Sequence, residues 1–136
     1  MGVFRGWRAG PLVLALLWLS GCGDDAPTGA PPSISALTLL TTTVPVAVGA
    51  TVSGTVTFHD DDGDPRQLLG DLVLPDQTTV PVIGTLLDVV AGQTDATLRF
   101  AVEVKAPVAG RYSLRLRMID DQFHPSATLT ASFDAQ

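Results

Sequence analysis

The chain has 136 residues, a length that suits one globular domain rather than two. It carries 14 acidic and 8 basic residues, and this net charge of −6 repels nucleic acid, so we expect no nucleic-acid partner. The single cysteine excludes a disulfide within the chain.

Residues 1–21 have the pattern of a signal peptide. Arg5 and Arg8 give a positively charged start, and the nine residues Pro11–Leu19 are apolar. Two small residues, Ser20 and Gly21, come next. A signal peptide requires charged, apolar and small segments in this order. Because a helix needs about 20 residues to span a bilayer, we expect no permanent transmembrane anchor.

The segment Leu19–Cys22 (LSGC) resembles the lipobox of bacterial lipoproteins, in which an apolar and two small residues precede a cysteine. The resemblance implies that the Cys22 thiol carries a diacylglyceryl group, that residues 1–21 are removed, and that the new amino group is acylated. Two or more acyl chains make a stable anchor, so the expected partner of Cys22 is a lipid bilayer of the cell envelope. Gly23 stands where an Asp would resemble an inner-membrane retention signal, so the outer membrane is favoured over the inner membrane in a Gram-negative host.

The mature chain begins with a short tether, residues 22–32. Removing the signal takes away two arginines and no acid, which changes the net charge from −6 to −8. Gly23–Pro32 has no apolar side chain larger than Ala or Pro, so it cannot bury an apolar face. Fully extended, these ten residues reach at most about 35 Å. Residues 33–136 then form a single domain rich in Val, Leu and Thr, which favour strands.

Alternation of apolar and polar residues predicts half-buried antiparallel strands in this domain. The clearest runs are Val44–Val48, Val52–Phe58, Ala96–Val104, Tyr112–Met118 and Leu129–Phe133. Weaker runs are Ile34–Leu40, Leu72–Leu74, Thr79–Ile83 and Leu86–Val90, of which the last also suits a helical turn. Gly, Pro and Asp clusters separate the runs. About seven short strands at this spacing predict an all-β sandwich of two sheets.

Two segments resemble bacterial immunoglobulin-like domains of the PKD and cadherin-like kinds. Val56–Asp64 (VTFHDDDGD) resembles their second strand and its acidic loop, and Ala109–Leu114 (AGRYSL) resembles their Gly-x-Tyr strand. The resemblance implies an immunoglobulin-like Greek-key β-sandwich in which Tyr112 forms a tyrosine corner, its hydroxyl bonding to backbone just upstream. The mature chain has no Trp and no disulfide, which excludes an antibody-type domain.

In this fold the B–C and F–G loops lie at one end of the sandwich. With Val52–Phe58 as strand B and Tyr112–Met118 as strand F, both histidines and six acids share that end. They are His59, Asp60, Asp61, Asp62 and Asp64 from one loop, and Asp120, Asp121 and His124 from the other. Strand A begins at the same end, so we expect the tether to emerge beside these acids.

The acidic end is a candidate Ca²⁺ site, because Ca²⁺ takes six to eight oxygen ligands. The predicted ligands are Asp60, Asp62, Asp64, Asp120 and Asp121. Pro65 stands where an EF-hand needs Gly and neither flank is helical, so an EF-hand is excluded. Two alternatives stay open: a solvated acidic turn without an ion, and a transition-metal site held by His59 and His124.

No catalytic constellation is visible, so we expect no enzyme activity. The preferred interpretation is a lipid-anchored, non-catalytic immunoglobulin-like domain that binds or scaffolds another envelope protein. One alternative is a calcium-dependent adhesion or stalk module that uses the acidic loops. The other is a lipoprotein that binds a transition metal. Arg99 is expected on a different sheet from Arg115 and Arg117, so we do not expect these three arginines to form one basic surface.

Overall fold

The computed structural model describes residues 29–82, 84–86 and 92–136. The predicted signal peptide, Cys22 and most of the tether lie outside these ranges, as do Ile83 and residues 87–91. A helix with the length and apolar character needed to cross a bilayer is absent from the described ranges.

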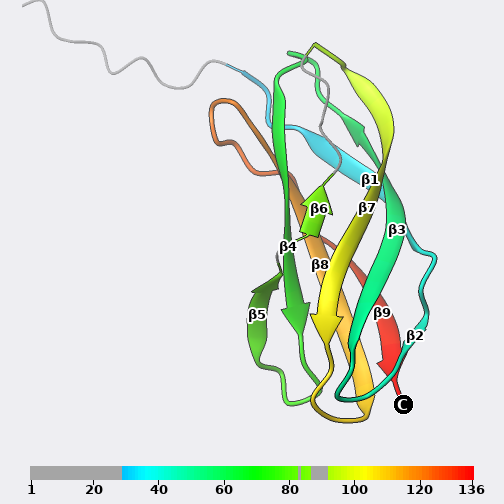
Figure 1. Cartoon of the computed structure of the whole chain (residues 1–136). Coiled ribbons are helices and arrows are strands. Elements are labelled where there is room, and N and C mark those ends of the chain that lie inside the picture. Colours follow the sequence, from blue (N-terminus) through cyan, green and yellow to red (C-terminus); the bar gives the residue numbers. More distant parts are fainter. Residues whose placement is uncertain (1–28, 83, 87–91) are drawn as a thin grey trace, which may run out of the picture.

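Two sheets pack face to face (Figure 1). The four-stranded sheet has the order β1-β3-β7-β6, with β1 at Ser33–Leu39, β3 at Gly49–His59, β7 at Asp95–Lys105 and β6 at Gly84–Leu86. The five-stranded sheet has the order β2-β9-β8-β4-β5. Its strands are β2 at Thr43–Val44, β9 at Leu129–Ala135, β8 at Gly110–Asp120, β4 at Pro65–Val73 and β5 at Thr79–Val82.

This strand order is that of an immunoglobulin-like β-sandwich, so the predicted fold is confirmed. β3 and β7 occupy the places of strands B and E, and β4, β8 and β9 those of strands C, F and G. All strand pairs are antiparallel except β2 with β9, which run parallel. Arg99 lies on β7, in the other sheet from Arg115 and Arg117 on β8, as expected.

The core forms because alternate residues of the long strands point between the sheets. Val52, Val56 and Phe58 of β3 are buried, and so is every second residue of β8 from Tyr112 to Met118. The Tyr112 ring stacks on Phe133 of the neighbouring strand β9, with ring centroids 5.6 Å apart. The period-two pattern of the sequence therefore matches the two buried faces.

Tyr112 also forms the tyrosine corner that the family resemblance implied. The side chain is fully buried, and its hydroxyl donates a hydrogen bond of 2.9 Å to the backbone carbonyl of Val108, four residues upstream. This bond ties the β7–β8 connection to the core.

Two strand predictions need correction in extent. The run Val44–Val48 forms a strand only at Thr43–Val44, because Pro45 has no N–H to donate and Ala47 has a positive φ of 62°. Val46 keeps one isolated bridge to Ala106, and Val48 is 58% exposed. β4 is much longer than the predicted Leu72–Leu74 and begins at Pro65. Of Leu86–Val90, only Leu86 lies in the described part, as the last residue of β6.

Candidate cation site at the acidic end of the sandwich

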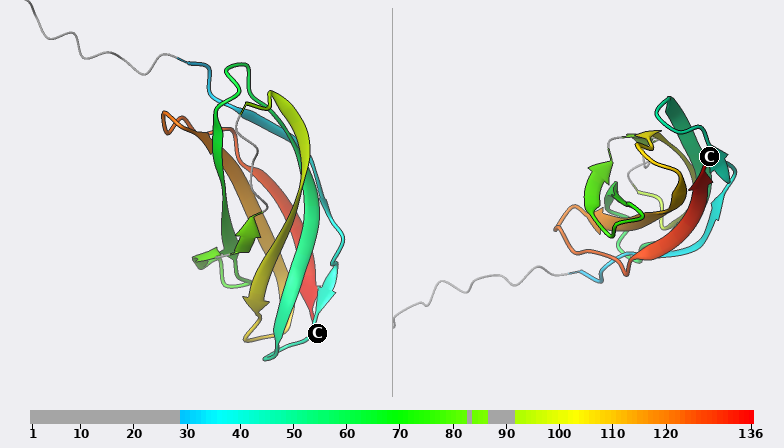
Figure 2. Two further views of the ribbon diagram at one scale, coloured as in Figure 1. Left: turned by 45° about the horizontal axis from the view of Figure 1, so that its top comes forward. Right: turned by 90° about the horizontal axis from the view of Figure 1, so that it is seen from below.

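The two acidic loops meet at one end of the sandwich, as predicted. The β3–β4 loop, residues 60–64, and the β8–β9 loop, residues 121–128, are joined by a hydrogen bond of 3.0 Å from the Asp121 N–H to the Asp64 carbonyl. Figure 2 shows this end from a second direction, with both loops on the side where the described chain begins. Most of the acids that sequence reasoning placed together are therefore neighbours in space.

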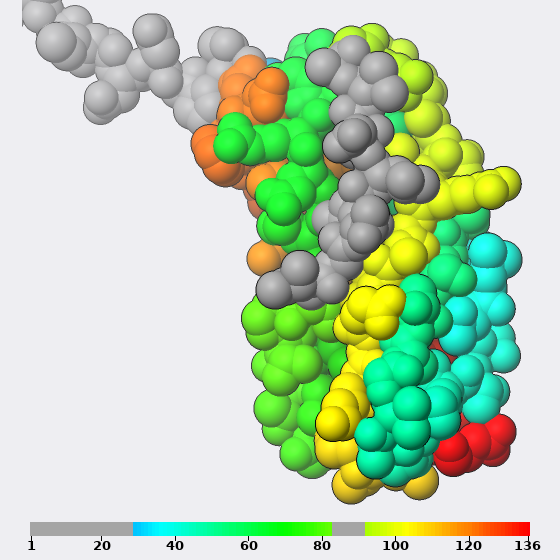
Figure 3. Space-filling view, in the orientation of Figure 1, coloured from blue at the N-terminus to red at the C-terminus, as the bar shows by residue number. Residues whose placement is uncertain are grey.

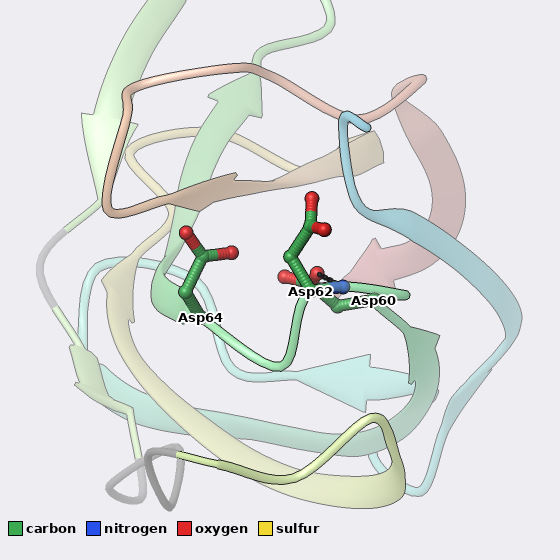
Figure 4. Close-up of side chains that lie close together, drawn as sticks. All are labelled: Asp60, Asp62 and Asp64. Carbon is green, nitrogen blue, oxygen red and sulfur yellow. Dashed lines mark hydrogen bonds between the residues drawn. The ribbon is translucent and has the colours of Figure 1, made fainter. Parts of the chain in front are cut away.

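The β3–β4 loop is a tight turn that folds back on its own first residue. Asp60 N–H donates to the Thr94 carbonyl at 2.7 Å, which fixes the loop to the start of β7. Gly63 adopts a positive φ of 66° and donates to the Asp60 carbonyl at 3.2 Å. The Asp62 N–H donates to Asp60 Oδ1 at 3.1 Å. The turn brings carboxylate oxygens of Asp60, Asp62 and Asp64 within 4.8 Å of one another (Figure 4).

Two carboxylate oxygens of this group are buried without a hydrogen-bond partner. Asp60 is only 1% exposed, and while its Oδ1 accepts from Asp62, its Oδ2 has no partner. Asp64 Oδ1 is likewise buried and unpartnered. A buried acceptor left unsatisfied costs about 1–3 kcal/mol, and more when it is charged. Burying these two oxygens without a bound cation is therefore energetically unfavourable.

The pKa of Asp64 reflects the same crowding of carboxylates. Burial raises the pKa of the Asp64 carboxyl above its ordinary value, and the negative charges of Asp60, Asp120, Asp62 and Asp121 raise it further. A cation bound among these carboxylates would favour the ionised form and oppose this shift.

Asp120, the last residue of β8, and Asp121, the first residue of the β8–β9 loop, are engaged differently. Asp120 is 1% exposed, and its oxygens accept from the His124 N–H at 2.7 Å and from the His124 Nδ1 at 2.8 Å. Burial by itself would raise the pKa of Asp120, but the hydrogen bonds and charge of His124 hold it below its ordinary value. Asp121 is exposed and lies 3.9 Å from Arg66 Nη1. Neither carboxylate joins the group formed by Asp60, Asp62 and Asp64, and their role as ligands stays a prediction.

The two histidines pair with separate aspartates. His59 Nδ1 lies 2.7 Å from Asp95 Oδ1 and its Nε2 lies 3.0 Å from Asp61 Oδ1. The hydrogen bond to Asp95 is the main cause that raises the pKa of His59, and the Asp95 charge and the Asp61 hydrogen bond add to it. Among the described residues, neither histidine belongs to a group of three or more close ligand atoms. The geometry therefore gives no support to a transition metal held by His59 and His124.

The tether leaves the domain between the two acidic loops, which confirms the expected exit. The Ala30 N–H donates to Asp62 Oδ2 at 2.8 Å. A Cβ on Gly29 would stand 2.9 Å from the same oxygen and 3.0 Å from Gln122 Nε2, so only glycine fits here without displacing a neighbour. Sequence reasoning missed the contacts of Gly29 and Ala30, because nothing in a Gly- and Pro-rich tether indicates which of its amides meets an acid.

Asp95 was also missed, although a signal for it exists. β3 and β7 pair in unbroken register from Gly49 with Lys105 to His59 with Asp95. Counting inward from paired strand ends would have placed Asp95 opposite His59, had the partner strands been known.

No family model and no curated protein matches the chain. Among solved structures, the PKD domain of an M14-like peptidase from a Thermoplasmatales archaeon is similar over 79% of this chain and 97% of that one, at 19% identity and a TM-score of 0.48. A DUF4785 family protein from Legionella pneumophila is similar over 73% of this chain and 27% of that one, at 12% identity and a TM-score of 0.50.

A third similar structure is an alkylpurine DNA glycosylase from Pseudomonas fluorescens bound to DNA with an abasic site analog. The similarity spans 79% of this chain and 31% of the glycosylase, at 12% identity and a TM-score of 0.47. Identities this low concern the fold alone, and the chain corresponds to less than a third of the length of these last two proteins.

Proposed function

We propose that the chain is a lipid-anchored protein of the bacterial cell envelope whose immunoglobulin-like domain is a non-catalytic binding module with a Ca²⁺ site at Asp60, Asp62 and Asp64. The observation that carries the cation site is the buried, unpartnered Oδ2 of Asp60 within a group of three carboxylates. The anchor is argued from sequence, by the signal pattern and the lipobox-like segment that ends at Cys22. In a Gram-negative host we place it in the outer membrane.

The ligand chemistry favours Ca²⁺ over a transition metal. All three candidate ligands are carboxylates, which are hard oxygen donors. Two oxygens on opposite sides of one Ca²⁺ are about 5 Å apart, twice the metal–oxygen distance, so oxygens within 4.8 Å can share one ion. Three carboxylates leave further positions for backbone carbonyls and water, which Ca²⁺ accepts because its coordination is flexible.

The non-catalytic part of the proposal is supported by how the histidines are used. His59 directs both ring nitrogens at aspartates and His124 directs its Nδ1 at one, and within the described residues no hydrogen bond joins a serine or threonine hydroxyl to either ring. A nucleophile activated by a histidine base therefore finds no support in this geometry.

Calorimetric titration of the mature chain with Ca²⁺, Mg²⁺ and Zn²⁺ tests the site. We expect heat with Ca²⁺ and its loss in Asp60→Asn, while Asp134→Asn, which removes the same charge at an exposed position of β9, keeps it. Absence of both heat and a shift in melting temperature with every ion would leave only a plain scaffold. Zn²⁺ binding that survives Asp60→Asn would instead favour the histidine site.

Metabolic labelling with an alkyne fatty acid tests the anchor separately. Label and membrane association should both depend on Cys22 and disappear in Cys22→Ala. A chain that is secreted without label would refute the anchor and leave the cation site untouched.

A further inference from the structure

An exposed aromatic residue stands at the tip of the β8–β9 loop, beside the cation site. Phe123 is 64% exposed and has a positive φ of 66°. A bulky residue rarely adopts this left-handed conformation, because it costs energy and persists only where the surrounding structure holds it. Here the Phe123 N–H donates to the Asp120 carbonyl at 3.1 Å, and Asp120 is itself fixed by His124. The loop is thus built to present this ring outward.

A cation lies directly over the ring. The guanidinium carbon of Arg66, the second residue of β4, is 4.5 Å from the ring centroid of Phe123, and Arg66 Nη1 is 3.9 Å from Asp121. Phe is one of the apolar residues by which interfacial protein segments enter the boundary between headgroups and acyl chains. A long cationic side chain can bury its stem there while its charge stays at the phosphates.

The described chain begins beside this loop. A Cβ added to Gly29, the first described residue, would stand 3.0 Å from Nε2 of Gln122, the residue before Phe123. Only seven residue steps separate Gly29 from Cys22, which span at most about 25 Å when fully extended. In Figure 3 the β8–β9 loop, drawn in orange, lies at the upper end of the molecule, the end at which the described chain begins in Figure 1. Cys22 is therefore at most about 25 Å from Gly29, and Gly29 lies beside this loop.

Electrostatic repulsion between the loop aspartates and anionic headgroups opposes contact of this end with the bilayer. The aspartates of the two loops repel an anionic headgroup surface, and Arg66 alone does not offset them. A divalent cation among Asp60, Asp62 and Asp64 removes most of their charge and can itself attract phosphate oxygens. The loaded site therefore lowers the electrostatic barrier between this end and the bilayer.

We propose that the β8–β9 loop, with Phe123 at its tip and Arg66 against the ring, docks on the bilayer that carries the Cys22 lipid when the aspartate site holds its cation. This inference rests on the proposed function, since it needs both the anchor and the ion. It makes the acidic end a membrane-contact surface and leaves the opposite end, with the β7–β8 connection, free for an envelope partner.

Phe123→Trp gives a direct test, because both natural tryptophans, Trp7 and Trp18, lie in the signal segment and the mature chain has none. The lipidated mature variant is reconstituted in vesicles of phosphatidylethanolamine and phosphatidylglycerol at three to one. With Ca²⁺ we expect the indole emission to shift to the blue and to be quenched by brominated lipid, and EGTA to reverse both. The matched control is Val108→Trp, an exposed position (53%) at the far end, which should show neither change.

Each outcome bears on a stated part of the inference. An indole at position 123 that stays as solvated as one at position 108, in saturating Ca²⁺, overturns the docking. A blue shift that persists in EGTA overturns its dependence on the cation. Mass measurement of the lipid and calorimetry of Ca²⁺ are made on the same sample, and an unchanged melting temperature identifies a folded variant. If lipid and Ca²⁺ are both present and the indole stays in water, the inference fails and the proposed function stands; if either is missing, both fail.

Discussion

The Asp60→Asn substitution should stabilise the metal-free domain and destabilise the Ca²⁺-loaded domain. In the metal-free domain the Asp60 carboxylate is buried at 1% exposure, with one oxygen unpartnered and two other carboxylates near it. The amide keeps an oxygen to accept from the Asp62 N–H, removes one negative charge, and offers a donor to the acids around it. We therefore expect the free energy of unfolding in EDTA to rise by about 1 kcal/mol, a typical net value for one buried hydrogen bond.

With Ca²⁺ the order should reverse. A ligand at one hundred times its Kd stabilises the folded state by about 2.7 kcal/mol, and the variant forfeits this contribution because it lacks a charged ligand. Subtracting the gain of about 1 kcal/mol leaves the variant less stable than the parent by about 2 kcal/mol. Urea unfolding followed by far-ultraviolet circular dichroism, in EDTA and in Ca²⁺, measures both differences.

Asp134→Asn, at an exposed position of β9, should show no such reversal and controls for net charge. If Asp60→Asn is destabilised equally in EDTA and in Ca²⁺, then Asp60 only shapes the turn and the cation site is refuted. If it is stabilised equally in both, the acids form a solvated turn without an ion.

Three further predictions follow from single contacts. Tyr112→Phe should lower the free energy of unfolding by about 1–2 kcal/mol in urea titrations, since the Val108 carbonyl loses its donor; an unchanged value would mean that water replaces the hydroxyl. The raised pKa of Asp64 means that the metal-free domain gains stability as the pH falls through that pKa toward the ordinary value of 3.8, and Asp64→Asn should abolish this gain in a series of urea midpoints. The raised pKa of His59 has an effect of the same sign: the stabilisation from its pairs with Asp95 and Asp61 is complete below 6.5 and is lost as the pH rises through the folded-state pKa. Asp95→Asn should therefore lower the His59 pKa measured by proton NMR, and an unmoved titration would show that Asp95 is not its main partner.

The sandwich could be predicted because most of its strands are amphipathic. Val52–Phe58 and Tyr112–Met118 alternate without interruption, so their buried faces can be read directly from the sequence. β4 could not be read in this way. Its sequence PRQLLGDLV places Gly70 and Asp71 among apolar residues, and the strand is specified instead by its register with β8. Pairing between distant segments is information that a local pattern does not contain.

The location of the candidate site could be predicted from the sequence, but the individual contacts of its side chains could not. The alternate spacing of Asp60, Asp62 and Asp64 and the loop geometry of the fold suffice to bring acids to one end. The burial of Asp60 and the separate use of Asp120 by His124 depend on how the chain closes around each side chain. The presentation of Phe123 depends on a backbone angle that no composition or spacing reveals.

The attachment of the tether at Asp62 has a mechanical consequence. The described chain enters at the acidic end and the C-terminus lies at the other, as Figure 1 shows. A pull between the proposed lipid anchor and a partner held at the far end would therefore run along the strands. The hydrogen bonds that join β1 to β3 lie across that direction, so they must break together in shear and not one after another. Because Ala30 bonds to Asp62 ahead of β1, the load reaches the ligand loop first, and an ion in that loop would strengthen the point where force enters the domain.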